Sequence, residues 1–503
     1  MSAAPTLDAA LRDWARRWAD RPAVIGNGET LSFAQLDAAA DAWAGRLVGQ
    51  GIGPGRRVAL LGANQPAWLA AAFGVWRSGA TLVPVSTFVT TRELGEMLAH
   101  AEPSALIVQP RMGHHDFAAM LERLPASVRP PLAFELVSRP DGAAPASAGG
   151  GDRDAIACIL YTSGTTGTAK GVMLSHRAIG ATVPPTAERG GLVPGDVTLS
   201  TLPLFWVAGL VIRALPTLAS GSALLLLESF SAEAAIEALR AHRPTALHLR
   251  PPQVGQLLAH PAFAPALLAG VRRGGGRVDW FAPHVDPERL CLITGYGMTE
   301  TAGYVTALDW RDPPAVRATA IGTPLPGVEL RIVAADERRC AAGETGEVRV
   351  RAPGQFSGYF KQPAGTGLDA DGFFRTGDLG SLDADGTFHF TGRSKDLLRI
   401  KGVNVSPAEV EAVLAAHPAV EAAHVVGLPP DGLDQELVAL IVPRGGGPLP
   451  EADLRTHAAE SLSTYKRPSR YLCIGREDVP LGGTSKPQRA ALAALAADRV
   501  RWH

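Results

Sequence analysis

Apolar runs alternate with helix-like runs along the first part of the chain. "RRVALLGAN" has the unbroken apolar centre of a buried strand, and "QPAWLAAAFGVWRSG" has the length and Ala/Leu content of a helix. "ATLVPVS" and "PSALIVQP" continue the series as strands. Strands that alternate with helices in this way predict parallel sheets whose faces are covered by helices.

The pattern changes after about residue 325. "VELRIVAADERRCAAGETGEVRVRAPG" alternates apolar and polar side chains between turn signals, which predicts hairpins and a small β-barrel-like part. Towards the C-terminus, "SPAEVEAVLAAHPAV" opens as a helix does, and "AAHVVGLP" and "ELVALIVP" predict strands. We therefore expect an α/β protein, with a large N-terminal domain (residues 1–394) of parallel-rich sheets flanked by helices plus the barrel-like part. A small mobile α+β C-terminal domain would follow over residues 395–503.

Composition and charge restrict the class of protein. The chain has 503 residues, of which 46% are hydrophobic and 19% charged, as in ordinary globular domains. Its formal net charge of -1 gives no overall attraction to nucleic acid, so no nucleic-acid partner is expected. The 4 cysteines are scattered, which argues against a zinc site or a disulfide framework. No segment has the pattern of a signal peptide or the length of a membrane span, so the sequence predicts a cytoplasmic protein.

The stretch "YTSGTTGTAK", residues 161–170, is the first candidate for chemistry. Gly164 and Gly167 let backbone N–H groups point inward, hydroxyls add donors, and Lys170 adds positive charge. The spacing differs from the Walker pattern of other phosphate-binding loops. On composition alone, a polyphosphate site and an ordinary surface loop remain equally open.

Two further motifs place ligand-binding side chains at the ends of predicted strands. "GYGMTET" follows the apolar run "LCLI", where α/β proteins bind ligands; Tyr296 offers a flat face for a base, Thr299 a hydroxyl and Glu300 a carboxylate for Mg²⁺. In "DGFFRTGDLG", Asp378 lies between two glycines and suits the two hydroxyls of a ribose. The alternatives are a hairpin turn for the first motif and an Asx-turn for the second.

The last two motifs are basic. "GRSKDLLRIKGVNVSPAEVE" carries Arg393, Lys395, Arg399 and Lys401 at the predicted domain boundary, where a solvated face is the simpler explanation. "GGTSKPQR" holds Lys486 on a Gly-rich turn near the C-terminus, where a lone lysine is usually inert.

Together and in this order, "YTSGTTG", "YGMTET", "FFRTGDLG", "GRSKD" and "TSKPQR" resemble the adenylate-forming superfamily of acyl-CoA synthetases, firefly luciferase and peptide-synthetase adenylation domains. The resemblance covers nearly the whole chain. It implies ATP-dependent activation of a small carboxylic acid through an acyl-adenylate, with Mg²⁺, followed by transfer to coenzyme A.

The resemblance also implies roles for individual residues in the nucleotide site. Lys486, Glu300 and Thr165 would be catalytic, and Glu300 would hold the metal. The β- and γ-phosphates would lie against Thr162, Ser163, Gly164, Thr165, Thr166, Gly167 and Lys170. Gly274, Gly275 and Tyr296 would bracket adenine, with Gly297 and Met298 in the same site, Thr299 at the α-phosphate, and Asp378 and Arg393 at the ribose.

The remaining implied sites serve the acid and the acceptor. The acid pocket would comprise Phe205, Trp206, Val207, Gly209, Arg250 and Gly303. Arg250 would bind a second polar group of the acid or form a structural ion pair. Lys395 would be the hinge on which the C-terminal domain turns, and Arg399 and Gly402 would line the tunnel for the thiol.

One departure from the family pattern bears on the substrate. "PLFWVAGL" has Trp206 where many acyl- and aryl-CoA ligases carry His, so Trp206 is expected to fill or gate the acid pocket. Amino-acid adenylation domains usually have Asp there, which argues against an α-amino acid. We expect an acid–CoA ligase. The alternatives are an amide ligase or a carrier-protein ligase, which would use an amine or a carrier thiol, and more remotely a non-catalytic nucleotide-binding protein. The acid and the oligomeric state are not predicted.

Overall fold

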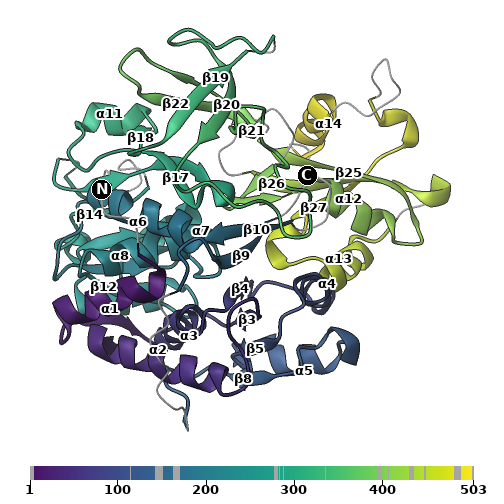
Figure 1. Ribbon diagram of the computed structural model, residues 1–503. Coiled ribbons are helices and arrows are strands. Elements are labelled where there is room, and N and C mark those ends of the chain that lie inside the picture. The colour runs from purple at the N-terminus through teal and green to yellow at the C-terminus, as the bar shows by residue number, and fades with distance from the viewer. Residues whose placement is uncertain are drawn as a thin grey trace.

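The computed structural model describes residues 5–113, 115–141, 151–162, 170–276, 281, 284–286, 288–334, 336–393, 398–405, 407–429, 435–446, 449–480 and 489–500. Two parallel-rich sheets form the larger part of the molecule (Figure 1). Every strand pair in them is parallel except β1 with β2 and β9 with β10. The alternation of strands and helices predicted this arrangement.

The first sheet has 7 strands, in the order β15-β14-β13-β11-β12-β1-β2. Their bounds are β1 Pro22–Gly26, β2 Glu29–Ser32, β11 Val197–Ser200, β12 Ala223–Leu226, β13 Ala246–His248, β14 Arg273–Gly275 and β15 Cys291–Ile293. The second sheet has 6 strands, in the order β10-β9-β4-β3-β5-β8. Their bounds are β3 Arg57–Leu61, β4 Thr81–Val85, β5 Ala105–Val108, β8 Ala133–Glu135, β9 Ile156–Thr162 and β10 Lys170–Ser175; the short hairpin of β6 Arg111–Met112 and β7 His115–Asp116 lies outside both sheets.

Helices cover these sheets. They are α1 Leu7–Trp18, α2 Phe33–Val48, α3 Pro66–Arg77, α4 Thr91–Ala101, α5 Phe117–Glu122, α6 His176–Gly190, α7 Val207–Gly209, α8 Leu215–Ala219, α9 Ala232–His242, α10 Pro251–Ala259 and α11 Pro314–Thr319. The start of α4 shows why a helix begins there. The Thr90 side chain accepts from the Glu93 N–H, and the Glu93 carboxylate accepts from the Thr90 N–H, so two otherwise unpaired backbone donors are satisfied.

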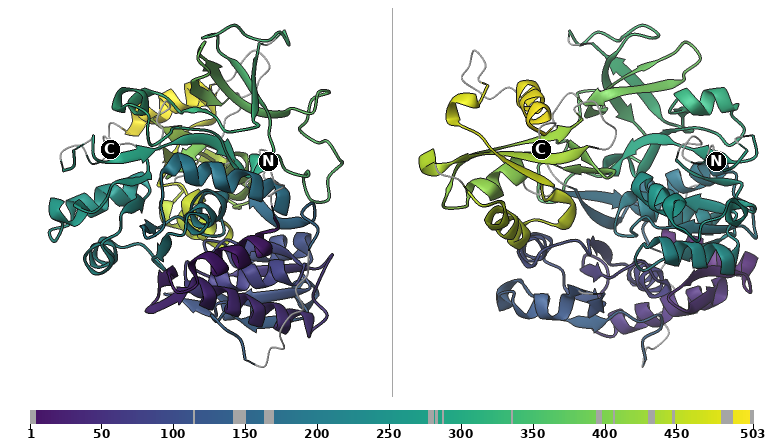
Figure 2. Two further views of the ribbon diagram at one scale, coloured as in Figure 1. Left: turned by 60° about the vertical axis from the view of Figure 1, so that its left-hand side comes forward. Right: turned by 180° about the vertical axis from the view of Figure 1, so that it is seen from behind.

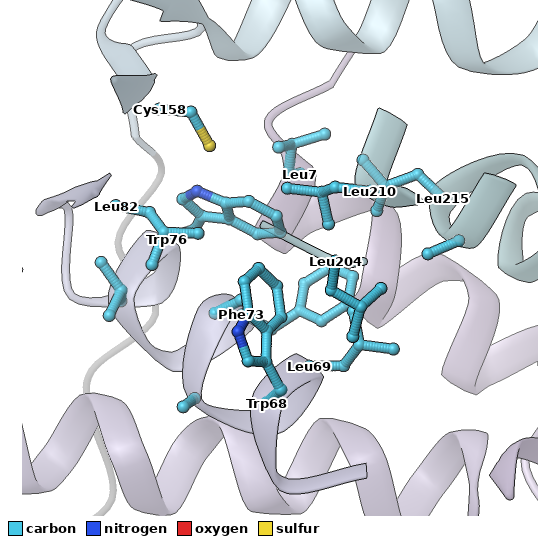
Figure 3. Close-up of a cluster of buried hydrophobic side chains, with 14 of the residues drawn as sticks. Leu7, Trp68, Leu69, Phe73, Trp76, Leu82, Cys158, Leu204, Leu210 and Leu215 are labelled. Atoms are coloured by element: carbon cyan, nitrogen blue, oxygen red, sulfur yellow. The ribbon is translucent and has the colours of Figure 1, made fainter. Parts of the chain in front are cut away.

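Helix α3 is the centre of the main core. It contacts β3 and β4 of one sheet and β1 and β2 of the other, and all of its residues are buried. A helix that is apolar all round has this position in a folded protein. Trp68, Phe73 and Trp76 fill the space towards Leu82, Cys158 and Leu210 (Figure 3).

Antiparallel strands follow, and the hairpin pattern predicted those after about residue 325. A 3-stranded sheet contains β16 Gly295–Met298, β17 Gly303–Ala307 and β18 Thr323–Pro324. A 4-stranded sheet, the barrel-like part, contains β19 Glu329–Val333, β20 Gly346–Arg351, β21 Phe374–Leu382 and β22 Phe388–Arg393.

The C-terminal part is a small α+β unit, as predicted. Its strands are β23 Leu398–Ile400, β24 Val403–Val405, β25 Val420–Leu428, β26 Glu436–Pro443 and β27 Arg470–Cys473, and its helices are α12 Pro407–Ala415, α13 Glu451–Ser461 and α14 Arg489–Val500. Alternate residues of β26 serve opposite faces: Leu437, Ala439 and Ile441 pack with α12 and α13, whereas Val438 and Leu440 pack with α14.

The C-terminal unit rests on the N-terminal part where α13 lies beside α4 (Figures 1 and 2). Lys466 Nζ lies 2.7 Å from Glu409 Oε1 of its own unit and 3.3 Å from Glu93 Oε1 of α4. Burial alone lowers the pKa of Lys466, but its acidic neighbours raise it above the ordinary value. The ring of Tyr465 lies 6.1 Å from that of Phe88. The predicted boundary at residue 394 and the mobility of this unit stay predictions, and Lys395 lies outside the described residues.

None of the helices in the described ranges combines the length and apolarity needed to cross a bilayer.

Candidate active site

The predicted ribose site is built by β16, β21 and β22. The Tyr296 hydroxyl donates to Asp378 Oδ2 at 2.8 Å, and both side chains are buried, at 8% and 2% exposed. The ring of Tyr296 packs against Phe388 and stacks on Phe390, with centroid distances of 4.9 and 5.9 Å. Asp378 is paired in register with Arg393 across β21 and β22. The structure thus brings together three residues that lie far apart in the sequence.

Two predicted glycines have a structural reason that needs no ligand. A Cβ on Gly297 would lie 2.0 Å from the Gly303 carbonyl oxygen, and a Cβ on Gly274 would lie 2.2 Å from the Leu247 oxygen. Each glycine therefore lets two strands approach closely. Met298 and Thr299 continue the same segment as the end of β16 and the start of a short 3₁₀ turn.

The predicted metal ligand Glu300 lies on that turn. The hydroxyl of Tyr359 donates to Glu300 Oε1 at 2.9 Å, and the Phe356 N–H donates to the Glu300 carbonyl at 2.8 Å. Lys170 Nζ lies 5.1 Å from the centre of the Tyr359 ring. Burial, followed by the charge of Glu300, raises the pKa of Tyr359 far above its ordinary value, so its proton stays on oxygen. Tyr359 thereby contacts both Lys170, at the end of the predicted phosphate loop, and Glu300, the predicted metal ligand.

The arrangement fits a magnesium ion shared with a nucleotide. In the described ranges no three His, Cys, Asp or Glu residues gather as a metal site. A Mg²⁺ held by Glu300 would therefore take its other oxygen ligands from phosphates and water, which is how this ion is usually bound beside nucleotides.

The predicted phosphate-binding residues lie between β9 and β10, which pair antiparallel. Thr162 is the last residue of β9 and pairs with Lys170, the first residue of β10, so both residues flank residues 163–169. Ser163, Gly164, Thr165, Thr166 and Gly167 lie outside the described residues, as does Lys486.

The predicted acid pocket begins after β11. Phe205 is buried and Trp206 half-buried, and Phe88 contacts both rings, with centroid distances of 5.6 and 6.0 Å. Val207 opens α7, and a Cβ on Gly209 would lie 1.9 Å from the Pro203 oxygen, so only glycine fits this turn. Phe88 was not predicted, because nothing in its neighbourhood along the chain marks it.

The π-helix Leu210–Ala214 follows α7 and contacts β17, which begins at Gly303. Gly303 has φ +109°, and a Cβ there would lie 2.9 Å from Ile212. Arg250 precedes α10, where its N–H donates to Gln253 Oε1 at 2.9 Å, so it lies next to the carboxyl edge of the sheet. The π-helix also brings in Arg213, whose Nη2 donates to the Tyr304 hydroxyl at 2.7 Å. Sequence reasoning did not find Arg213.

The two predicted tunnel residues lie on the hairpin of β23 and β24. Lys401 and Gly402 have φ of 50° and 79° and form its two-residue turn, a conformation that favours glycine. The Arg399 N–H donates to Gln435 Oε1 at 2.9 Å, and the Gln435 N–H donates to the Arg399 carbonyl at 2.7 Å.

Comparison with known proteins agrees with this geometry. Residues 11–360 match the family model of AMP-binding enzymes, and residues 409–486 match that of the AMP-binding enzyme C-terminal domain.

The chain belongs to the AMP-binding enzyme family.

Relatives and solved structures cover nearly the whole chain. The chain is 32% identical to the sulfoacetate–CoA ligase of Cupriavidus necator over 97% of both proteins. It is similar to the amide bond synthetase McbA of Marinactinospora thermotolerans, with a TM-score of 0.81, 32% identity, and coverage of 96% of this chain and 99% of that one. A malonyl-CoA ligase with methylmalonyl-CoA and AMP bound gives a TM-score of 0.77, 32% identity, and coverage of 94% and 98%. The enzyme is an ATP-dependent, AMP-forming carboxylic acid ligase, which confirms the prediction from its motifs.

Proposed function

We propose that the enzyme activates a small carboxylic acid as its acyl-adenylate and then passes the acyl group to the thiol of coenzyme A. One observation carries this proposal. A single segment, from Tyr296 on β16 to Glu300 on the next turn, supplies both the hydrogen-bond partner of Asp378, the proposed ribose ligand, and Glu300, the proposed magnesium ligand. Both ends of a nucleotide would therefore be held by one continuous piece of chain.

In the first step an oxygen of the acid carboxylate attacks the α-phosphorus of ATP, and pyrophosphate leaves. Asp378 would hold the ribose, and Lys170 would face the phosphates beside Tyr359. Glu300 would hold Mg²⁺, which neutralises phosphate charge when bound. Lys486 would contact the acid carboxylate and the α-phosphate, offsetting the repulsion between two anions.

In the second step a nucleophile attacks the carbonyl of the acyl-adenylate, and AMP leaves. Coenzyme A is the acceptor we favour, since two similar proteins are named for CoA products or substrates. The C-terminal unit would turn at Lys395 between the steps, and the hairpin of Arg399 and Gly402 would then approach the thiol. Because the reaction uses ATP and CoA, we propose that it takes place in the cytoplasm.

An amine acceptor is the second candidate, because McbA, at a TM-score of 0.81, is an amide bond synthetase. Trp206 would then shape the acid pocket in the same way. The two candidates differ only in the second step.

Trapping the intermediate tests both steps separately. The enzyme is incubated with ATP and a labelled acid, the acyl-AMP is isolated with the protein, and CoA or a panel of primary amines is then added in separate portions. We expect acyl-AMP to accumulate and CoA to release AMP faster than any amine does. Release by amines alone would move the assignment to amide ligase, and absence of acyl-AMP with every acid would contradict the proposed function.

A further inference from the structure

The π-helix Leu210–Ala214 carries Arg213, a residue next to the predicted acid pocket. Arg213 Nη2 donates to the Tyr304 hydroxyl at 2.7 Å, and its guanidinium carbon lies 5.5 Å from the centre of the Tyr304 ring. Ile212, the preceding residue, borders Gly303. Arg213 thus shares its surroundings with a residue predicted to line the acid pocket.

This guanidinium has no anionic partner in the part of the chain that the structure describes. Its contacts are with the neutral Tyr304 hydroxyl and ring, and its Nε is buried without an acceptor. A half-buried cation normally gains a carboxylate partner on folding, because burial without one is costly. Arg213 is therefore available to an anionic group of a ligand.

A second polar group lies at the same place. His248, at the carboxyl end of β13, is 6% exposed, and its buried Nδ1 has no hydrogen-bond partner among the described residues. Gly275 was predicted to contact adenine, and a Cβ on it would lie 2.5 Å from Arg213 Nη2 and 2.7 Å from His248 Nδ1. The two groups therefore converge on one point, between the predicted adenine site and the predicted acid pocket. Burial and the charge of Arg213 lower the pKa of His248 well below its ordinary value, so the neutral ring can donate or accept.

We propose that Arg213, with His248 beside it, binds a second anionic group of the acid substrate, a carboxylate or a sulfonate, distinct from the carboxylate that is adenylated. The inference rests on the proposed function, because it places this subsite at the acid end of the same site. The planar guanidinium forms paired hydrogen bonds to a carboxylate or sulfonate, which gives both attraction and orientation. Tyr304 is a positioning residue, because its hydroxyl accepts a hydrogen bond from Arg213 Nη2 at 2.7 Å.

The alternative is that Arg213 only packs on Tyr304. The test therefore compares acids that differ in the second anion alone. The matched pairs are succinate with butyrate, glutarate with valerate, 3-sulfopropionate with butyrate, and terephthalate with benzoate. Acid-dependent ATP–pyrophosphate exchange is measured for each, together with the thermal shift that each acid causes in the presence of a non-hydrolysable ATP analogue.

The variants are Arg213→Met and, as a matched control, Arg273→Met. Arg273 is also half-buried, lies 4.3 Å from the Trp310 ring, and has a buried Nε without a partner, but it is not part of the proposed subsite. We expect at least one doubly anionic acid to exceed its partner by ten-fold or more in kcat/KM. Arg213→Met should remove that preference and Arg273→Met should keep it. In Tyr304→Phe the KM for the dianion should rise several-fold, with kcat little changed.

The outcomes separate this inference from the proposed function. Activity with monoanionic acids only, or a preference unchanged in Arg213→Met, would overturn the subsite and leave the ligase function standing. A dianion could cause a thermal shift in wild type but not in Arg213→Met, while no acid supports ATP–pyrophosphate exchange. This result would support the subsite and contradict the proposed function. Neither exchange nor a shift with any acid would overturn both. Comparing 3-sulfopropionate with succinate separates sulfonate from carboxylate.

Discussion

The proposed nucleotide end and the proposed acid end of the site differ in how their polar side chains are hydrogen-bonded. At the nucleotide end, Tyr296 donates to Asp378 at 2.8 Å and Tyr359 donates to Glu300 at 2.9 Å. At the acid end, and among the described residues, Arg213 donates to the Tyr304 hydroxyl alone and His248 Nδ1 has no hydrogen-bond partner. At the nucleotide end, protein side chains already hold the carboxylates in place. At the acid end, a ligand would supply the missing hydrogen-bond partners.

The largest expected effect comes from the charge at the nucleotide end. Glu300→Gln keeps the shape and the contact with Tyr359 but removes the negative charge that would hold magnesium. We expect kcat for pyrophosphate exchange to fall about 10²–10³-fold, the usual loss when one electrostatic contact to a transition state is removed. Glu329→Gln, an exposed residue of β19 paired with Arg351, is the control and should behave as wild type. Equal exchange in both variants would remove Glu300 from the reaction.

Asp378→Asn tests the ribose contact. The amide keeps one acceptor but loses the charge, so we expect the KM for ATP to rise about ten-fold, the loss of a hydrogen bond to a charged group. Asp383→Asn is the matched control, since Asp383 is half-exposed and pairs with His389 at 2.7 Å just beyond the same strand. An unchanged KM for ATP in Asp378→Asn would mean that the buried carboxylate serves the fold alone.

The acid end should respond to pH. The pKa of folded His248 lies well below 6.5, so the unfolded chain takes up a proton that the folded protein does not. Neutral His248 therefore contributes to the free energy of unfolding above pH 6.5. This contribution is lost as the pH falls below 6.5, by up to about 1.4 kcal/mol for each pH unit. Urea unfolding between pH 8 and pH 5.5 measures this slope, which His248→Asn should reduce. Burial also lowers the pKa of His176, to about 4, and this adds a similar pH dependence in wild type and in His248→Asn. The test is therefore the difference between the slopes of the two proteins. An identical slope in both would place His248 in a solvated environment.

Tyr359→Phe should have the smallest effect. The ring stays beside Lys170, and only the hydrogen bond to Glu300 is lost, which is worth about 1 kcal/mol. We expect a several-fold fall in kcat and a stronger requirement for added Mg²⁺, read from a magnesium titration of the exchange rate. Tyr471→Phe in the C-terminal unit controls for removal of a buried hydroxyl. A magnesium requirement equal to that of wild type would show that Tyr359 does not orient the metal ligand.

The sequence marks the proposed nucleotide end more clearly than the proposed acid end, for a physical reason. The residues of "YGMTET" and "TGDLG" lie on strands and turns. There the local composition determines the backbone conformation, so the sequence indicates a candidate site. Tyr359 meets Glu300 across 59 residues and Arg213 meets Tyr304 across 91, and such pairs leave no local signal. The π-helix that directs Arg213 is also set by tertiary packing rather than by any residue pattern. The sheets themselves were predictable because strand and helix periods are local properties.

The contact between the C-terminal unit and the N-terminal part also has no local signal in the sequence. Glu93 caps α4 and also faces Lys466 at 3.3 Å across 373 residues. The cap formed by Thr90 and Glu93 involves residues three positions apart, so the sequence indicates it. The contact of Glu93 with Lys466 depends instead on how the C-terminal unit packs on the N-terminal part.

The most direct test of the central claim, attack of the acid on the α-phosphorus of ATP, is the fate of the carboxylate oxygens. An accepted acid labelled with ¹⁸O in its carboxylate is converted with ATP and coenzyme A, and the products are analysed by mass spectrometry. If the carboxylate attacks the α-phosphorus, AMP will carry one ¹⁸O atom and pyrophosphate none. Label found in inorganic phosphate together with ADP would mean that the γ-phosphorus is attacked instead, and would contradict the account.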